Sequence, residues 1–391
     1  MQLSFDADVE AFRAEFIAFL DEHLPDEAET TQRSHSSADI PQWARRWQRV
    51  QFDHGWLLPG NPPEFGGCNA TILQQYVHLE ELSRRRIYHS FNPQGLGIIA
   101  ASLLSFGTEE QKRTWAVPIL RAEMTAALGM SEPGAGSDLA GLRTSAVLTD
   151  DHFVVNGQKV WTSGAHDADV ILTFVRTDPN APKHKGISVL LIPADTEGVV
   201  RRPFPSWTYP DELDFNEVFF SDARVPVENL IGPLNGGWGV ANGSLGHERT
   251  LLWLSFAARL EAMIADRAPA GALEADNFAT LIMDANALRL LGSAALAREA
   301  RGEQDVPSLS VLKLLGAEAV QSAAEHALNA AGADGLHHPS TTAPYSPYNE
   351  DSESLGWFDR YQRSFAGTIA GGTSEIQRGI IAQRVLGLPR A

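Results

Sequence analysis

Apolar residues recur at spacings of three and four from Asp6 to about Arg121, which is the spacing of one face of an α-helix. The first such face consists of Val9, Phe12, Phe16, Phe19 and Leu20. A second helix is predicted from Thr71 to Arg86, and a third begins at Thr108, a good N-cap followed by acidic residues. A proline- and glycine-rich loop, LLPGNPPEFGG, separates the first helix from the second. We therefore predict a helical domain over residues 1–122.

The pattern changes near Glu123, where the apolar residues fall into extended runs. Asn156 and Gly157, within HFVVNGQKVW, favour a two-residue hairpin turn between two strands. Further strands are predicted at DVILTFVRT, GISVLLIPA and DFNEVFFSDARV. No helical stretch lies between these runs, which argues against a parallel sheet with helical crossovers. Residues 123–232 are therefore predicted to form a β domain.

The helical pattern returns from Gly236 onward. The run LLWLSFAARLEAMIAD is apolar on nearly all sides, which indicates a buried helix. Alanine-rich stretches at 285–301 and 315–331 indicate closely packed helices, and HHPSTTAPYSPYNEDSES is predicted to be a linker. A last helix should begin near Thr373 and end at Gly387. Its apolar stripe is Ile376, Ile380, Ile381, Val385 and Leu386. Residues 233–391 therefore complete an α+β multidomain chain.

Composition narrows the function classes. A chain of 391 residues exceeds one compact core, so two or three domains are expected. The 49 acidic and 31 basic side chains give a net charge of −18, which disfavours nucleic acid and anionic membranes as partners. Cys68 is the only cysteine, so an internal disulfide is excluded and a cysteine-based metal site is not expected. Without a signal-peptide layout or a membrane-length apolar run, we expect a cytoplasmic protein.

The segment GMSEPGAGSD, from Gly129 to Asp138, is the densest local signal. Its glycines would let backbone N–H groups approach a ligand closely, and Ser131 and Ser137 add hydroxyl groups. The same residue types are also typical of an ordinary turn. The segment does not match the G-x-G-x-x-G dinucleotide fingerprint.

Two more segments carry candidate chemistry. In KVWTSGAH, an aromatic ring followed by two hydroxyls could stack on a planar ligand and bond its edge, although a tryptophan at a strand end is often buried. In TIAGGTSEIQR, two glycines lead into a helix start, so the backbone could approach a large flat ligand. That glycine pair offers no acid, base or nucleophile.

Taken together, these motifs resemble the acyl-CoA dehydrogenase family. The resemblance covers nearly the full chain, in WLLPGNPPEFGG, FGTEEQK, GMSEPGAGSD, NGQKVWTSG, SDARVPVENLIG and GGTSEIQRGIIAQRVLGLPR. It implies an N-terminal helical domain, a middle β-barrel or sandwich domain and a C-terminal four-helix bundle. It also implies FAD-dependent oxidation of an acyl-CoA thioester to the trans-2-enoyl-CoA, with flavin N5 accepting the β-hydride and electrons passing to an electron-transfer flavoprotein.

The resemblance assigns site residues position by position. Ser131 would bond the pyrimidine edge of the flavin, and Ser163 would lie near its reactive N5 edge. The implied FAD contacts are Leu128, Met130, Ser131, Gly136, Ser137, Trp161, Thr162, Ser163, Thr373 and Glu375. The implied substrate contacts are Ser137, Leu245, Arg249, Gly371 and Gly372. A helix N-terminus near Thr373 suits the FAD diphosphate electrostatically.

The reaction needs a carboxylate base for the α-proton, held in a dry pocket that raises its pKa. Many family members carry this base directly before the Gly-Thr of the last motif, where this chain has Gly371. Relatives that act on isovaleryl-CoA and long-chain substrates supply it from a helix after the β domain. The residue that matches is Glu248, in LGHERTLL. The alternative is that Glu248 is a solvated helix residue, and neighbouring His247 points in another direction on a helix.

Two family elements are weakened. The Arg-x-x-Phe-Gly stretch that holds the FAD of a neighbouring subunit is absent, and Arg267 is the nearest candidate. The Gln-x-x-Gly-Gly loop is degraded to Asn329, Gly332 and Ala333. Either an α2β2 hetero-oligomer with a related subunit or a homotetramer with looser FAD binding would account for this.

The sequence leaves more than one function and more than one substrate class open. A flavin oxidase or monooxygenase and a non-catalytic subunit are the other functions on the same fold. Gly95 and Gly97, in FNPQGLGIIAA, indicate either a roomy acyl pocket for a branched or steroid-like group or tight helix packing.

Overall fold

The computed structural model describes residues 5–26, 38, 40–85, 87, 92–205, 213–265, 272–303, 306–336 and 356–389, without the side chains of 244–250, 272, 273 and 306. The chain divides into two compact units. The helical unit consists of Met1–Gln32, Asn69–His89 and Arg249–Ala391. The sheet unit consists of Arg33–Cys68 and Ser90–Glu248. The described helices include none with the length and hydropathy needed to cross a membrane.

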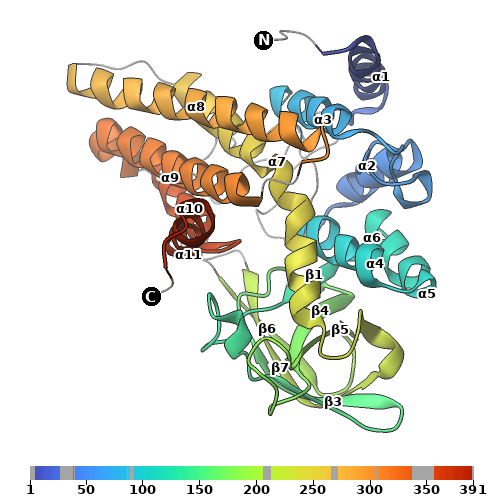
Figure 1. Ribbon diagram of the computed structural model, residues 1–391. Helices are drawn as coiled ribbons and strands as arrows, with labels where there is room; N and C mark the ends of the chain where they lie inside the picture. Colours follow the sequence, from blue (N-terminus) through green and yellow to red (C-terminus); the bar gives the residue numbers. More distant parts are fainter. Residues whose placement is uncertain are drawn as a thin grey trace. The chain divides into compact units, whose positions relative to one another are not determined.

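The sheet unit is built on eight strands (Figure 1). They are β1 (Ala126–Gly129), β2 (Ser145–Leu148), β3 (His152–Lys159), β4 (Val170–Arg176), β5 (Ile187–Pro193), β6 (Val199–Pro205), β7 (Leu213–Pro226) and β8 (Leu230–Ile231). The order is β6-β7-β3-β2-β4-β5-β8, and β1 pairs with β4. All pairings are antiparallel except β1–β4 and β2–β4. The largely antiparallel sheet confirms that no crossover helices connect these strands.

The same unit also contains short helices. They are α2 (Gln42–Asp53), η2 (Pro63–Phe65), η3 (Gly95–Ala100), α4 (Ala101–Phe106), α5 (Glu109–Gln111), η4 (Lys112–Ala116), α6 (Val117–Leu120), η5 (Leu139–Gly141), η6 (Ala165–Asp167) and η7 (Val227–Asn229). Most of them pack on one face of the sheet, whereas Ala165 of η6 packs with Ile171 and Leu190 on the other. One core cluster joins Leu103 and Ile119 of these helices to Leu172 and Val189 of the sheet. Thr108 caps α5 as predicted, in a reciprocal pair of bonds with Gln111.

The predicted hairpin at Asn156 and Gly157 is wrong. Residues 152–159 form one continuous strand, and the two residues occupy a bulge where β3 changes register against β7. Asn156 is held by Asp222, since its Nδ2 donates to the Asp222 carboxylate at 2.9 Å and its Oδ1 accepts from the Asp222 N–H at 2.9 Å. Gly157 has φ +148°, and a Cβ there would lie 2.6 Å from Thr144 Cα. Glycine is therefore required by a close approach between strands rather than by a turn.

The helical unit contains α1 (Ala7–His23), α3 (Ile72–Arg84), most of α7 (Gly237–Ala265), α8 (Ala272–Glu299), α9 (Val306–Ala331), η8 (Gly332–Leu336), α10 (Trp357–Ile369), α11 (Ser374–Ile380) and η9 (Ile381–Val385). The five apolar residues predicted for α1 are all buried, and Thr71 caps α3 in a capping box with Gln74. α9 packs against α8, α10 and α11. The predicted α, β, α order is confirmed.

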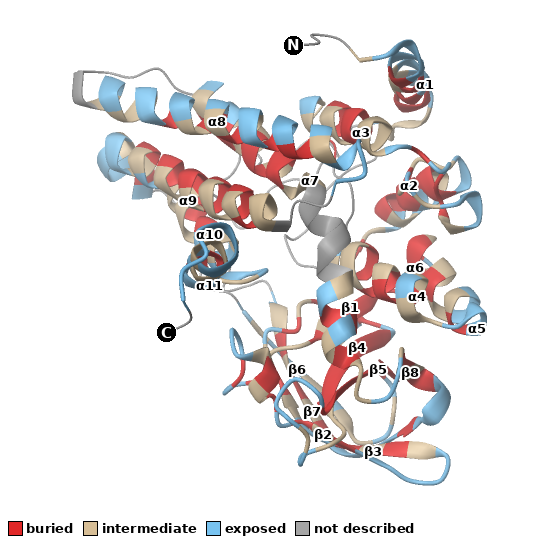
Figure 2. Cartoon of the chain, in the orientation of Figure 1, coloured by how far each residue is buried: buried red, intermediate tan, exposed pale blue. Residues whose placement is uncertain are grey.

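Small residues let the helices of this unit approach α7. A Cβ on Gly292 of α8 would lie 2.3 Å from the Trp253 ring, and one on Gly316 of α9 would lie 2.5 Å from the Phe256 ring. Both aromatic residues belong to the apolar run predicted to be buried, and both are buried. Figure 2 shows exposed positions along the length of α8, and its Met283 and Leu290 are 69% and 65% exposed.

The last helix starts as predicted, because the Thr373 hydroxyl accepts a hydrogen bond from the N–H of Ile376 at 3.3 Å. Gly387 has the left-handed φ of +66° typical of a helix stop. The apolar stripe of this last helix is not buried within the chain, since Ile376 is 41% and Leu386 is 65% exposed. The predicted linker, HHPSTTAPYSPYNEDSES, lies outside the described residues.

Candidate active site

The glycine-rich loop leaves the sheet at the end of β1 and turns at once. Glu132 and Ala135 exchange two backbone hydrogen bonds, at 2.9 and 3.0 Å, around Pro133 and Gly134. Proline and glycine favour the two central positions of such a turn. None of residues 130–137 has a positive φ, and a Cβ on Gly134 or Gly136 would meet no atom within 4 Å. The loop is therefore an open surface on a regular backbone.

The tryptophan motif lies directly against this loop. Val160 donates its N–H to the carbonyl of Ser131 at 3.0 Å, which joins two segments that the sequence separates. Trp161 follows with φ +61°, an uncommon conformation for a bulky residue. Thr162 is tied to Asn216 of β7 by two bonds, from its N–H at 3.2 Å and to its carbonyl at 3.0 Å. Strain of this kind persists only where the surroundings over-determine it, and it is frequent at functional sites.

The side chains at this junction form a planar face and a polar edge. The Trp161 ring is 59% exposed and is steadied edge-on by Phe204 and Phe215, with centroids 5.3 and 5.5 Å away. Ser131 and Ser163 are half-buried, and their hydroxyls have no hydrogen-bond partner among the described residues. The Thr162 hydroxyl also has no partner in the described part of the chain, but unlike the two serine hydroxyls it is fully buried.

The other FAD contacts predicted in this unit differ in how far they are exposed to solvent. Leu128 and Met130 are half-buried and pack on the core cluster, while Gly136 and Ser137 are exposed. The structure therefore brings Ser131 and the Trp161 segment together, and leaves the open end of the loop beside them free in solvent.

A buried ion pair lies behind the loop. Lys159, the last residue of β3, places its Nζ 2.8 Å from Oε1 of Glu132, and the two side chains are 0% and 8% exposed. Burial lowers the pKa of Lys159 to about 8, against the opposing attraction of Glu132. Burial alone would raise the pKa of Glu132, but Lys159 and the N–H groups of Arg143 and Thr144 leave it below its ordinary value.

The terminal motif forms a second loop, in the helical unit. Gly371 and Gly372 have φ of +67° and +96°, and no atom lies within 4 Å of a Cβ placed on Gly371. Buried Lys313 of α9 donates from Nζ to the carbonyl of Gly372 at 2.7 Å. Gln377 donates to the carbonyls of Gly371 and Gly372 at 3.2 and 3.4 Å. The loop is therefore held by its carbonyl groups.

Three consecutive family models match the chain: the N-terminal domain of acyl-CoA dehydrogenases over residues 6–123, the middle domain over 127–223 and the C-terminal domain over 235–386. The chain belongs to the acyl-CoA dehydrogenase family. The acyl-CoA dehydrogenase IpdE1 of Mycobacterium tuberculosis is 34% identical, with 98% of each chain covered. The homologues are oxidoreductases that act on CH–CH bonds, and this chain is one of them.

Solved structures agree with the sequence comparison. The Tcur3481-Tcur3483 steroid ACAD has 30% identity and a TM-score of 0.82, with 100% of both chains covered. The ChsE4-ChsE5 complex from Mycobacterium tuberculosis has 28% identity and a TM-score of 0.78, again over 100% of both chains. Acyl-CoA dehydrogenases use FAD, and the exposed Trp161 ring with its adjacent hydroxyls is compatible with a planar ring that has a polar edge.

Several predicted positions of the acyl-CoA dehydrogenase site fall elsewhere. Arg267 lies outside the described residues. Leu245, Glu248 and Arg249 lie on α7 within residues 244–250, whose side chains are not described. Glu375 is exposed near the start of α11, where its own N–H and the Thr373 hydroxyl lower its pKa.

The segment from Asn329 to Gly332, which the family resemblance assigns to the FAD of a neighbouring subunit, lies at the far end of α9. Asn329 is exposed near the end of that helix, and Gly332 follows with φ +59°. Lys313, which holds Gly372, precedes Asn329 by sixteen residues, or about 24 Å along a helix. Within one helical unit, Asn329 and Thr373 are therefore too far apart to bind the same phosphate group.

Sequence reasoning missed the residues that hold the acyl-CoA dehydrogenase motifs in place. Glu132 and Lys159 are charged residues inside GMSEPGAGSD and NGQKVW, so opposite charges in two joined motifs could have indicated a pair. Lys313 is the one charged residue in the apolar run VLKLLGA, which could have indicated a buried lysine with a specific role. Nothing in the sequence pointed to Asn216.

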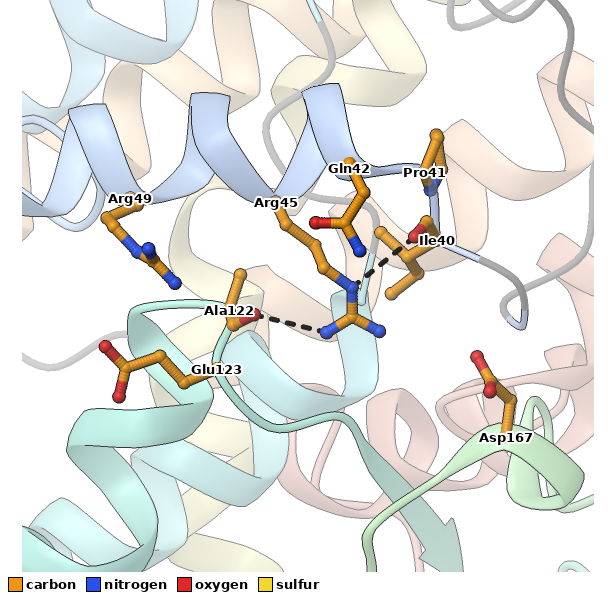
Figure 3. Close-up of a pocket in the computed structure, with 8 residues that line it drawn as sticks. All are labelled: Ile40, Pro41, Gln42, Arg45, Arg49, Ala122, Glu123 and Asp167. Atoms are coloured by element: carbon orange, nitrogen blue, oxygen red, sulfur yellow. Dashed lines mark hydrogen bonds between the residues drawn. The ribbon is translucent and has the colours of Figure 1, made fainter.

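A cavity of about 670 Å³ opens elsewhere on the sheet unit (Figure 3). Arg45 lies in it and donates to the carbonyls of Ile40 and Ala122, at 3.4 and 3.1 Å. The carboxylates of Glu123 and Asp167 share the same lining. None of the residues assigned to the cofactor or substrate lines this cavity, so it is separate from the acyl-CoA dehydrogenase motifs.

Proposed function

We propose that this chain catalyses FAD-dependent α,β-dehydrogenation of an acyl-CoA thioester to the trans-2-enoyl-CoA, and that electrons pass to an electron-transfer flavoprotein. The observation that carries the proposal is the junction of Ser131 with the Trp161 segment in the sheet unit. Bound FAD would supply a hydride acceptor. The hydroxyls of Ser131 and Ser163 would bond the polar edge of its ring system.

Glu248 is the proposed base that removes the α-proton. Gly371, where many relatives carry the base, has no side chain, so a carboxylate must come from another segment. A carboxylate works in this role when it lies within hydrogen-bond reach of the proton and when a dry environment raises its pKa. The family resemblance of LGHERTLL supports the assignment. Leu245, Arg249 and Ser137 are proposed substrate contacts on the same basis.

The glycine loop is proposed to hold the thioester oxygen. Lys313 and Gln377 take up the carbonyls of Gly371 and Gly372, so the N–H groups of the following residues point away from them. N–H groups fixed in this way can donate to a developing enolate oxygen without reorganising. The left-handed φ of Gly371 exposes the backbone there without a side chain.

Assembly is proposed to complete the cofactor site. Because Asn329 and Thr373 are separated along α9, the diphosphate contacts of one FAD would come from two chains. Arg267 lacks the family's sequence context, and Asn329 and Ala333 replace the Gln and the second Gly of the family loop, which supports a related second subunit that supplies these contacts. The similar proteins Tcur3481-Tcur3483 and ChsE4-ChsE5 are named as pairs of chains. We therefore propose an α2β2 hetero-oligomer over a homotetramer.

A bulky acyl group, such as a steroid-derived side chain, is the proposed substrate class. The support is the similarity of this chain to the Tcur3481-Tcur3483 steroid ACAD. Gly95 does not support it, since a Cβ there would lie 2.7 Å from Oδ1 of Asn92, which accepts from the Gly95 N–H at 2.8 Å. Tight packing therefore accounts for that glycine.

The first test is to purify the full chain alone and measure its mass and its FAD content. Anaerobic addition of straight-chain, branched and steroid-derived acyl-CoA esters should bleach the flavin absorbance. Flavin that no ester bleaches would contradict the dehydrogenase proposal, and rapid reoxidation by air would favour an oxidase. A homotetramer with one FAD per chain would contradict the hetero-oligomer.

The second test is Glu248→Gln. General-base catalysis contributes about 10²- to 10⁴-fold, so turnover should fall by that factor while FAD content stays unchanged. His247→Gln is the matched control on the neighbouring position and should retain most activity. Turnover that survives in Glu248→Gln would show that another group is the base.

A further inference from the structure

The Glu132–Lys159 pair ties together three segments behind the candidate flavin loop. Glu132 accepts from the N–H of Arg143 through Oε2 at 2.7 Å and from that of Thr144 through Oε1 at 2.9 Å. The same Oε1 receives Lys159 Nζ at 2.8 Å. Three hydrogen bonds therefore tie the carboxylate to the turn after the loop and to the end of β3.

Lys159 makes a second hydrogen bond, to the backbone of the loop itself. Its Nζ donates to the carbonyl of Met130 at 3.2 Å, and Val160 donates to the next carbonyl, that of Ser131, at 3.0 Å. Two successive carbonyls of the loop are thus fixed to two successive residues after β3. Because a trans peptide is planar, the N–H of Ser131 must point away from the ammonium.

This contact changes the donor strength as well as the direction. An ammonium group that bonds a carbonyl polarises the whole peptide, and the effect is larger in a buried, low-dielectric setting. The N–H of Ser131 is the donor end of that peptide. It is therefore a stronger donor toward an acceptor oxygen than an ordinary backbone amide.

Stability alone does not account for two buried charges at this place. A buried ion pair gains little over well-packed apolar residues, because desolvation of both groups offsets their attraction. The stem of Lys159 packs beside Gly129 of β1, an apolar contact that does not require the ammonium group. The pair therefore calls for a role in which the charge itself matters.

We propose that Lys159, paired with Glu132, is a positioning residue of the cofactor site that orients and polarises the Met130–Ser131 peptide toward a carbonyl oxygen on the ring edge of FAD. This inference rests on the proposed function. Lys159 touches neither cofactor nor substrate, and acts through the backbone of Ser131.

The test uses the full chain in the assembly that binds FAD, with the double variant Glu132→Gln/Lys159→Met. This variant removes both charges and leaves neither buried alone. Loss of a charge-assisted contact should weaken FAD binding roughly tenfold to a hundredfold and shift the visible flavin spectrum and midpoint potential. Near neutral pH, unfolding of the apoprotein should stay close to that of the unaltered chain.

The matched control is Asp138→Asn/Lys183→Met, an exposed ion pair at the end of the same loop. It should leave FAD affinity and flavin spectrum within about twofold, as expected of exposed pairs. A folded Glu132→Gln/Lys159→Met protein with unaltered FAD affinity, spectrum and potential would overturn the inference alone. An unaltered chain that takes up no FAD in any assembly would overturn the proposed function and the inference with it.

A measurement on the unaltered protein covers the case in which the double variant does not fold. Glu132 is the charged group that acts on Lys159, and the Lys159 ammonium loses its proton as pH rises through about 8. The dissociation constant for FAD should therefore increase above that pH. A constant that is flat across this range would contradict the proposed role.

Discussion

The two candidate loops are each held by a buried lysine, but in different settings. Lys159 of the sheet unit donates to the carbonyl that precedes Ser131, and Lys313 of the helical unit donates to the carbonyl that precedes Thr373. In both places the lysine directs the N–H of a hydroxyl residue away from itself. The same solution therefore occurs in two unrelated pieces of backbone.

The difference lies in what else holds each loop. The sheet-unit loop has a regular backbone and relies on a full charge pair, since Glu132 lies 2.8 Å from Lys159. The terminal loop contains two left-handed glycines, and the neutral amide of Gln377 shares the carbonyls with Lys313. The first loop should thus depend on its buried charge pair, and the second on backbone conformation as well as on Lys313.

The two loops should differ most in the free energy of unfolding that is lost when each lysine is replaced by methionine. Lys159→Met leaves Glu132 buried without its partner, which should lower the free energy of unfolding by about 3–5 kcal/mol. Lys313→Met removes a charge-assisted bond while Gln377 still donates, so about 1.5–3 kcal/mol is expected. Urea unfolding of both variants measures this. A larger loss in Lys313→Met would reverse the comparison.

The pH dependence of stability should separate the two loops next. Burial lowers the pKa of Lys159 from 10.5 to about 8. Between these values the folded protein binds fewer protons than the unfolded chain, so this group's contribution to the free energy of unfolding rises with pH. Across the whole window the rise is roughly 3 kcal/mol.

The measurement is the stability of the unaltered chain minus that of Glu132→Gln/Lys159→Met, followed from about pH 7 to pH 10. Subtraction removes the titration of groups that both proteins share. FAD affinity should fall over the same range in which this difference rises. A difference that does not change with pH would show that Lys159 does not titrate in this window.

A glycine-to-alanine series gives the smallest expected effects. Gly129→Ala places a Cβ 3.2 Å from Ile171 Cγ2 and Thr173 Oγ1, and such overpacking should lower stability by about 1–3 kcal/mol. Gly371→Ala has open space but a left-handed φ, for which about 1 kcal/mol is expected. Gly134→Ala meets no atom within 4 Å and should change stability by less than about 0.5 kcal/mol. Thermal unfolding would rank the three, and a larger loss for Gly134→Ala would contradict the open loop.

Local signals in the sequence were sufficient for much of the fold. Thr71, Thr108 and Thr373 cap helices because each capping bond spans only three residues. The strands β4, β5 and β7 carry the apolar and β-branched residues that a half-buried or buried sheet requires. The hairpin prediction was wrong because Asn156 is held by Asp222, which lies sixty-six positions later and is not part of any local pattern.

The candidate site divides in the same way. The sequence by itself determined the family, the residue types of both loops and the absence of a carboxylate at Gly371, because these depend on order alone. Only the tertiary structure decided that Glu132 pairs with Lys159, that Val160 bonds Ser131 and that Lys313 holds Gly372. Each of those contacts joins segments far apart in the chain. Their formation depends on burial, since desolvation is what makes a lysine seek a carboxylate or a carbonyl.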